Sequence, residues 1–139
     1  MKNVTILGST GSIGTSALEL LEALGDRFAV VGLAAGANTS LLCRQAKKFR
    51  PKIVSLKTSE EAQKLRAFLQ DSSVRVVHGP EGAEEVARFE ENEVVVSAIT
   101  GIDGLRPTLE AVRTGGRVAL ANKESMVVAG ALLRREAEV

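Results

Sequence analysis

The chain alternates short apolar runs with segments of helical periodicity, and this alternation constrains its fold more than any other feature. Residues 4–7 and 28–35 are apolar runs, and between them apolar side chains recur every three or four residues from Ile13 to Leu24. That spacing is typical of an amphipathic helix. A run that is apolar on both faces is typical of a parallel strand covered by helices on each side.

The same alternation continues along the whole chain. Strands are predicted at residues 4–7, 28–35, 52–56, 74–77, 93–98 and 117–121, and helices at 13–24, 38–49, 58–69, 80–88, 102–113 and from Ser125 onward. Strands that alternate with helices predict an α/β domain with a Rossmann-like, doubly wound, mainly parallel sheet and helices on both faces. Its crossovers are expected to be right-handed.

Composition excludes several classes of function. The 139 residues carry 18 basic and 17 acidic side chains, which gives no sign of a nucleic-acid or membrane surface. One Cys and one His exclude a disulfide framework, a multi-Cys zinc site and a His-rich metal centre. No apolar run reaches the ~20 residues of a membrane span, and no signal or transit peptide is recognisable. We therefore expect a cytoplasmic protein whose four Phe side chains fill the core.

A glycine-rich loop joins the first predicted strand to the first predicted helix. Residues 8–14, Gly-Ser-Thr-Gly-Ser-Ile-Gly, have the spacing G-x-x-G-x-x-G. In a dinucleotide site Gly8 would allow a tight exit from the strand, Gly11 close approach of a pyrophosphate, and Gly14 close packing of the helix. The amides of residues 10–13 would point at the anion. A turn that serves only packing is the alternative, but the position between strand and helix favours cofactor binding.

The end of the second predicted strand carries no carboxylate. Dinucleotide-binding folds that select NAD commonly place Asp or Glu there, about 20 residues after the loop, to hold the ribose 2′-hydroxyl. Here residues 34–40 read Ala-Ala-Gly-Ala-Asn-Thr-Ser, with Arg44 one turn further on. Gly36 and neutral donors at a helix start suit a 2′-phosphate, which favours NADP(H). Alternatively, Asn38 or Thr39 serves only as the helix N-cap.

Polar residues also interrupt the last predicted strand–helix junction. Lys123 could neutralise an oxyanion or hold a substrate hydroxyl, and Glu124 could accept a hydrogen bond from a ribose or substrate hydroxyl. A solvated helix cap is the alternative. Cys43 is expected to be a small buried residue and His78 a surface loop residue, so no catalytic residue is assigned within the chain.

These segments together resemble the 1-deoxy-D-xylulose 5-phosphate reductoisomerase family. The match covers residues 6–14, 34–38, 97–101, 104–109 and 120–125, and the run Leu-Ala-Asn-Lys-Glu-Ser is its most specific part. The resemblance implies an NADPH-dependent enzyme of non-mevalonate isoprenoid synthesis that uses a divalent metal, Mg²⁺ or Mn²⁺, and forms a homodimer. It would rearrange 1-deoxy-D-xylulose 5-phosphate to an aldehyde and reduce that aldehyde to 2-C-methyl-D-erythritol 4-phosphate.

Residue roles follow from the resemblance by position. Lys123 would contact substrate, and the cofactor-binding residues would be Gly8, Thr10, Gly11, Ser12, Ile13, Gly14, Gly36, Ala37, Asn38, Asn122 and Glu124. Ala37 departs from the basic or polar side chain that is common in the family, so contact with a 2′-phosphate there would use the backbone only.

The resemblance also bears on domain organisation. The metal ligands of the family, an Asp-x-Glu pair and a later Glu, follow its Lys-Glu-Ser helix, so none is expected in this chain. Residues 1–139 are therefore expected to be the amino-terminal NADPH-binding domain of a longer enzyme, inactive in isolation. Two alternatives stay open, namely another NADP-dependent reductase with a similar loop and a nucleotide-binding module without catalysis.

Overall fold

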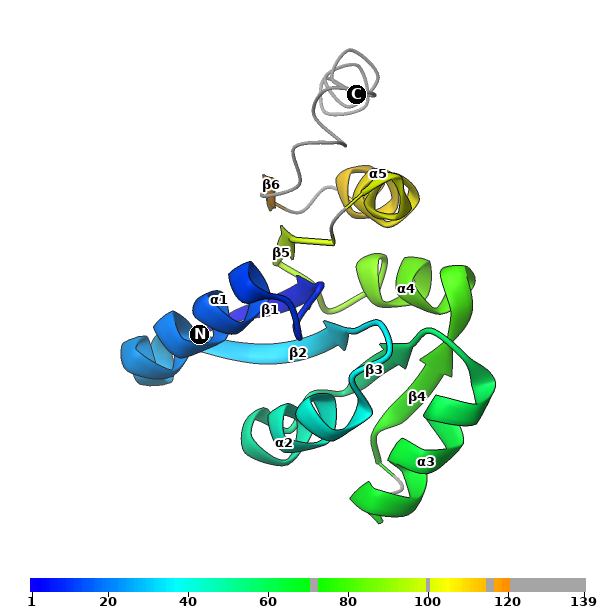
Figure 1. The fold of residues 1–139 in the computed structure, drawn as a ribbon. Helices are drawn as coiled ribbons and strands as arrows, with labels where there is room; N and C mark the ends of the chain where they lie inside the picture. Colours follow the sequence, from blue (N-terminus) through cyan, green and yellow to red (C-terminus); the bar gives the residue numbers. More distant parts are fainter. Residues whose placement is uncertain (71–72, 100, 115–116, 121–139) are drawn as a thin grey trace.

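Six parallel strands form one sheet in the order β4-β3-β2-β1-β5-β6 (Figure 1). The computed structural model describes residues 1–70, 73–99, 101–114 and 117–120. The strands are β1 (Lys2–Leu7), β2 (Phe28–Ala34), β3 (Ile53–Leu56), β4 (Arg75–His78), β5 (Val94–Ser97) and β6 (Arg117–Leu120). The predicted Rossmann-like parallel sheet is therefore confirmed.

Five α-helices connect the strands in the part of the chain that the structure describes. They are α1 (Ser12–Leu24), α2 (Thr39–Phe49), α3 (Ser59–Leu69), α4 (Gly79–Ala87) and α5 (Leu105–Arg113), with short 3₁₀ turns at Gly25–Arg27 and Ile102–Gly104. Each agrees with a predicted helix to within a few residues. The helix predicted from Ser125 lies outside the described residues.

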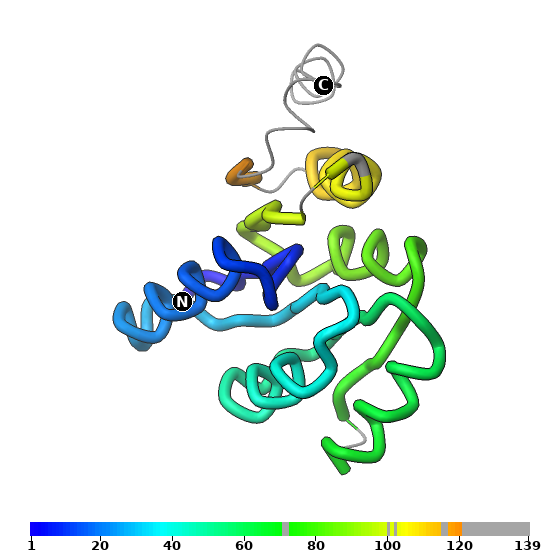
Figure 2. The backbone as a smooth tube through the Cα atoms, viewed as in Figure 1, coloured from blue at the N-terminus to red at the C-terminus, as the bar shows by residue number. Residues whose placement is uncertain are grey.

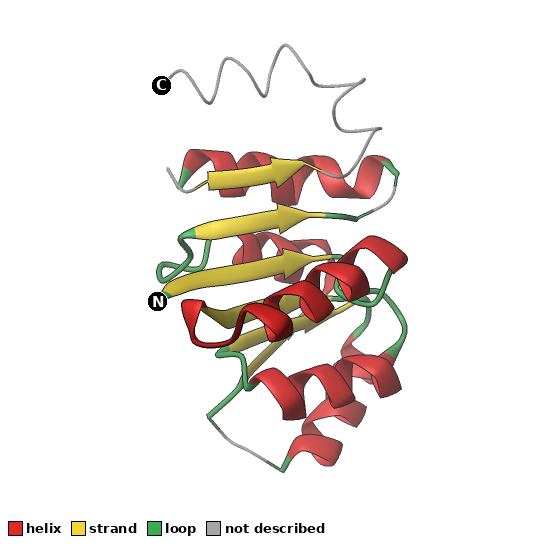
Figure 3. Cartoon of the chain, turned by 90° about the vertical axis from the view of Figure 1, so that its left-hand side faces the viewer, coloured by secondary structure: helices red, strands yellow, loops and turns green. Residues whose placement is uncertain are grey.

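Each face of the sheet has its own apolar core, as expected for a sheet with helices on both sides (Figure 3). On one face Leu18 of α1, Leu42 of α2 and Leu65 of α3 pack against sheet residues. On the other face Val86 of α4 and Ala111 of α5 do the same. Phe68, which was expected in the core, is instead 57% exposed, so that prediction is wrong for this residue.

Local signals explain where the helices begin and end. The Asn38 and Thr58 side chains accept hydrogen bonds from backbone N–H groups in the first turns of α2 and α3, as N-cap residues do. α2 ends at Phe49 and is followed by Arg50, which has a left-handed backbone and precedes Pro51. Proline has no N–H and disfavours a helical residue before it, so α2 cannot continue.

The chain reverses its direction of travel across the sheet between β4 and β5. It runs outward from β1 through β2 and β3 to β4, then returns to the other side of β1 (Figure 2). In open α/β sheets such a reversal leaves a crevice at the carboxyl ends of the two central strands, where ligands bind. Here those strands are β1 and β5, and the glycine loop leaves β1 at that crevice. None of the described helices is long and apolar enough to cross a membrane.

Candidate functional site

Two glycines of the loop after β1 are required by the packing of the chain itself. Gly8 has φ +87°, and a Cβ there would lie 2.6 Å from the carbonyl oxygen of Ala98, just past β5. A Cβ on Gly14 would lie 2.1 Å from the Gly8 carbonyl oxygen. Real Cβ atoms do not approach that closely. Gly8 therefore allows the tight exit predicted for it, and Gly14 lets α1 pack against the loop rather than directly against the sheet.

Two other glycines have no such internal reason. Gly11 has an ordinary backbone with φ −80°, and a Cβ there would meet only the Gly8 carbonyl oxygen, at 3.6 Å. A Cβ on Gly36 would meet nothing within 4 Å. Both residues are exposed. The protein could accept a side chain at either position, so the open space in front of them is available to a bound molecule.

The start of α1 presents backbone donors to the same space. Among the described residues, the N–H groups of Thr10, Ser12 and Ile13 have no hydrogen-bond partner. The amide of Gly11, which was also expected to face the anion, instead donates to the Gly8 carbonyl oxygen at 3.2 Å. The first turn of α1 carries no acidic side chain. Free amides at a helix N-terminus, without a nearby carboxylate, favour a bound anion.

The loop after β2 lies directly beside the glycine loop. The amides of Gly8 and Ser9 both donate to the carbonyl oxygen of Ala34, at 2.8 and 3.0 Å. Asn38 caps α2, because its Oδ1 accepts from the amide of Leu41 at 3.2 Å. Asn38 is therefore the N-cap of α2, which is one of the two roles predicted for it. Capping does not use the amides of Ala37 and Asn38, which have no partner in the described part of the chain.

Positive charge near this second loop comes partly from a residue that the sequence did not suggest. The backbone N–H of Lys57, the first residue after β3, donates to the Gly36 carbonyl oxygen at 3.0 Å. Lys57 is exposed, as is Arg44 on α2. The first turn of α2 has no acidic side chain. Lys57 could be identified from the sequence only if the order of the strands were known, because β3 is the neighbour of β2 and their carboxyl ends meet.

Gln45 is a second residue that the sequence did not suggest. It lies on the buried side of α2 with Leu42, Cys43 and Ala46, and its Nε2 donates to the carbonyl oxygen of Ser9 at 2.8 Å. The sequence signal that points to Gln45 is a polar residue within the apolar stripe of a predicted helix. Gln45 therefore connects the helix after the second loop to the glycine loop.

The end of β5 closes the crevice on its other side. The Ser97 and Thr108 hydroxyls lie 2.5 Å apart, and the Thr108 hydroxyl also donates to the Gly104 carbonyl oxygen at 2.6 Å. This buried pair fixes the start of α5 against β5. Ala98 lies against Gly8.

Several predicted residues lie elsewhere. Asn122, Lys123 and Glu124 lie outside the described residues. Cys43 is buried, as expected. His78 was expected in a loop, but it is the last residue of β4 and directly precedes α4. Within the described ranges no three His, Cys, Asp or Glu side chains are grouped so that they could hold a metal ion, so we place no metal site on them.

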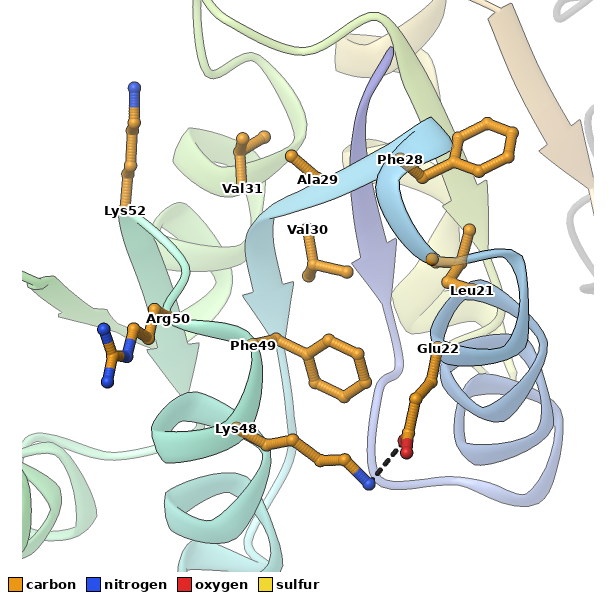
Figure 4. A pocket seen from close by; sticks show the side chains of 11 residues that line it. Leu21, Glu22, Phe28, Ala29, Val30, Val31, Lys48, Phe49, Arg50 and Lys52 are labelled. Atoms are coloured by element: carbon orange, nitrogen blue, oxygen red, sulfur yellow. Dashed lines mark ion pairs between the residues drawn. The ribbon is translucent and has the colours of Figure 1, made fainter. Parts of the chain in front are cut away.

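A surface pocket of about 470 Å³ lies at the opposite edge of the sheet (Figure 4). It is formed where β2 begins and where α1 and α2 end, with Phe28, Val30 and Phe49 among its apolar lining residues. An ion pair between Lys48 and Glu22 lies at its rim. Because ligands of parallel α/β sheets bind at the carboxyl ends of the strands, this pocket is separate from the candidate site.

Comparisons with known proteins agree on one family. The family model described as 1-deoxy-D-xylulose 5-phosphate reductoisomerase matches residues 4–130. The protein of that name from Caldanaerobacter subterraneus subsp. tengcongensis is 48% identical over 133 residues, which are 96% of this chain and 34% of the relative. The chain thus spans about a third of the length of the curated relatives that it matches.

Solved structures give the same result. The 1-deoxy-D-xylulose 5-phosphate reductoisomerase from Zymomonas mobilis in complex with NADPH is 39% identical, with a TM-score of 0.93 over 99% of this chain and 36% of that one. A DOX-P reductoisomerase in complex with NADPH, fosmidomycin and magnesium is 34% identical, with a TM-score of 0.94 over 99% of this chain and 34% of that one.

Proposed function

Because this chain belongs to the 1-deoxy-D-xylulose 5-phosphate reductoisomerase family, we propose that residues 1–139 form the NADPH-binding domain of such an enzyme. The observation that carries this proposal is the pair of open glycines, Gly11 and Gly36, on two loops that Ala34 holds together. Neither glycine is needed for the fold, and both leave room at the carboxyl edge where a dinucleotide would lie.

The geometry supports a specific placement of the cofactor. The pyrophosphate lies over Gly11, where the free amides of Thr10, Ser12 and Ile13 can donate to it. The adenosine ribose with its 2′-phosphate lies over Gly36, Ala37 and Asn38. A 2′-phosphate needs space, donors and positive charge, and the second loop offers an open glycine, unpaired amides and the nearby Lys57.

The packing glycines Gly8 and Gly14 act indirectly, because they shape the loop without facing the open space. Asn122, Glu124 and Lys123 are proposed contacts that rest on the family resemblance alone. The first two would bind NADPH and the third would bind substrate. The relative from Zymomonas mobilis was solved with NADPH, which supports the choice of cofactor for this chain.

For the whole protein we propose the reaction that the family name states. NADPH, when bound, supplies the hydride that reduces the rearranged substrate. The role of the described residues is to bind and orient this cofactor at the end of β1. A related structure contains magnesium, and we assign Mg²⁺ or Mn²⁺ to the whole enzyme rather than to the residues described.

Location and assembly are further proposals. The family resemblance supports a cytoplasmic enzyme that acts on a sugar phosphate and forms a homodimer. Size-exclusion chromatography coupled to light scattering on the whole protein would test the dimer, and a monomer at micromolar concentration would contradict it.

Titration of the chain with NADPH and NADH, followed by calorimetry or by cofactor fluorescence, tests the central proposal. We expect saturable binding of NADPH, and weaker binding of NADH because it lacks the 2′-phosphate. A turnover assay with 1-deoxy-D-xylulose 5-phosphate and Mg²⁺ on the whole protein then tests the reaction. Failure of NADPH to bind, or equal affinity for NADH, would contradict the proposed cofactor site.

A further inference from the structure

Gln45 connects the two loops of the candidate site from inside the protein. Its side chain is 6% exposed, and its Nε2 donates to the carbonyl oxygen of Ser9 at 2.8 Å. Ser9 is fully buried and immediately precedes Thr10, whose amide has no hydrogen-bond partner among the described residues. Gln45 therefore does not touch a bound molecule, but it holds the residue next to one of the proposed pyrophosphate donors.

The backbone N–H and C=O groups of Ser9 both form hydrogen bonds with the segment that contains β2 and α2. The Ser9 amide donates to the carbonyl oxygen of Ala34, the last residue of β2. The Ser9 carbonyl accepts from Gln45 on α2. Because Gly36–Asn38 lie between β2 and α2, these two hydrogen bonds fix the glycine loop relative to the second loop.

The polar contact is retained although it leaves buried atoms unsatisfied. Neither Gln45 Oε1 nor Ser9 Oγ has a hydrogen-bond partner among the described residues, and both are buried. An unsatisfied buried polar atom is destabilising. A Met or Leu at this position would remove Gln45 Oε1 but leave the buried Ser9 carbonyl without its donor, so the hydrogen bond from Nε2 is the feature of Gln45 that an apolar residue cannot replace.

We propose that Gln45 is a positioning residue that sets the glycine loop for the pyrophosphate and couples it to the loop that holds the 2′-phosphate. This inference rests on the proposed function of NADPH binding. Its role is specific to the donor group, because a carbonyl oxygen can be held only by an N–H or O–H.

The test compares Gln45→Met with the matched control Gln63→Met, which makes the same chemical change on the exposed surface of α3. Two ligands distinguish the contribution of the glycine loop from that of the second loop. NADPH uses both loops, whereas adenosine 2′-phosphate has no pyrophosphate and uses the second loop. For Gln45→Met we expect NADPH affinity to fall by about 10-fold and affinity for adenosine 2′-phosphate to change by less than about 2-fold. Gln63→Met should change neither.

A purely structural role predicts a different result, in which both ligands weaken together. That result, or unchanged NADPH affinity in a folded Gln45→Met variant, would overturn the proposal. Gln45→Leu, which also lacks a donor, should behave like Gln45→Met. Wild-type affinity for NADPH in Gln45→Leu would also overturn it.

Amide hydrogen exchange provides a readout that does not depend on the cofactor. In the free protein, Gln45→Met should speed exchange at the Ser9 amide by about 10-fold or more relative to wild type, while amides in the centre of β1 and β2 keep their protection. Unchanged exchange at Ser9 would overturn the proposal even if NADPH did not bind. Failure of the wild-type chain to bind NADPH would contradict the proposed function instead.

Discussion

Glycine has two different roles among the residues at the carboxyl edge of the sheet. At Gly8 and Gly14 a Cβ would collide with backbone atoms of the protein at 2.6 and 2.1 Å. At Gly11 a Cβ would lie at an ordinary contact distance of 3.6 Å from the Gly8 carbonyl oxygen, and at Gly36 it would meet nothing within 4 Å. The first pair is explained by folding, whereas the second pair has no such explanation among the described residues and is explained by a bound molecule under our proposal. This distinction separates a change in stability from a change in binding.

Gly11→Val should therefore fold and fail to bind. The residue has φ −80° and faces open space, so the branched side chain fits the backbone of the free protein but occupies the proposed pyrophosphate position. We expect NADPH affinity to fall by at least about 10-fold, or about 1.4 kcal/mol, with Tm within a few degrees of wild type. Calorimetric titration with NADPH and a thermal melt of the same sample provide the two measurements.

Gly14→Ala is the contrasting control. Its Cβ would lie 2.1 Å from the Gly8 carbonyl oxygen, so the loop or α1 must shift. Overpacking of this kind costs about 1–3 kcal/mol, and we expect a lower Tm before any ligand is added. If Gly11→Val lost stability like Gly14→Ala, or kept its NADPH affinity, Gly11 would be a packing residue and the placement of the pyrophosphate would be wrong.

The junction of β2 and α2 combines a helix cap with a candidate phosphate site. Asn38 accepts from Leu41 to begin α2, and the amides just before it stay free. The loop after β3 adds a cation, because the Lys57 amide is bonded to the Gly36 carbonyl oxygen. Two strand–helix junctions therefore contribute to the proposed 2′-phosphate site.

Lys57→Gln should lower the preference for NADPH over NADH. The 2′-phosphate is the group that distinguishes the two cofactors. An exposed cation beside it contributes only a fraction of the binding free energy that a fully buried cation would contribute. We expect NADPH affinity to fall by about 2- to 5-fold and NADH affinity to stay unchanged. Lys64→Gln, an exposed change on α3, is the matched control. Equal losses for both cofactors would remove Lys57 from the 2′-phosphate site.

The sequence was most informative at the scale of elements. Apolar runs and caps such as Asn38 predicted the strands and helices, because these signals are local. Gly8 was also interpreted correctly, since a tight exit from a strand is local. Gln45 was missed, because its partner Ser9 is 36 residues away and only the finished sheet brings them together. Phe68 was misassigned for a similar reason, since exposure depends on what packs against α3.

The reversal of the chain between β4 and β5 explains why the site lies where it does. The sheet grows from β1 in both directions, so β1 and β5 end side by side with no connecting loop across them. The glycine loop borders one side of this crevice and the end of β5 borders the other. Strand order depends on tertiary packing, and for that reason the sequence could predict a parallel sheet but not the neighbours of Gly36.

A ligand that binds both loops should stabilise the whole domain, because the loops are fixed to β1, β2 and α2. A ligand that binds only the folded state at 100 times its Kd adds about 2.7 kcal/mol to the free energy of unfolding. For a domain of this size that corresponds to a rise in Tm of roughly 8–10 °C. Differential scanning fluorimetry of the chain with NADPH measures this shift.

NADH at the same concentration gives the discriminating comparison. If the missing 2′-phosphate weakens binding by about 10-fold, NADH is present at only about 10 times its own Kd, and the stabilisation falls to about 1.4 kcal/mol. The expected rise in Tm is then roughly 5 °C, half of that with NADPH. Gly11→Val should reduce the shift with either cofactor, to about half or less with NADPH, whereas Lys57→Gln should reduce only the shift with NADPH. Identical shifts for the two cofactors in the wild-type chain would mean that the loop from Gly36 to Asn38 does not bind a phosphate.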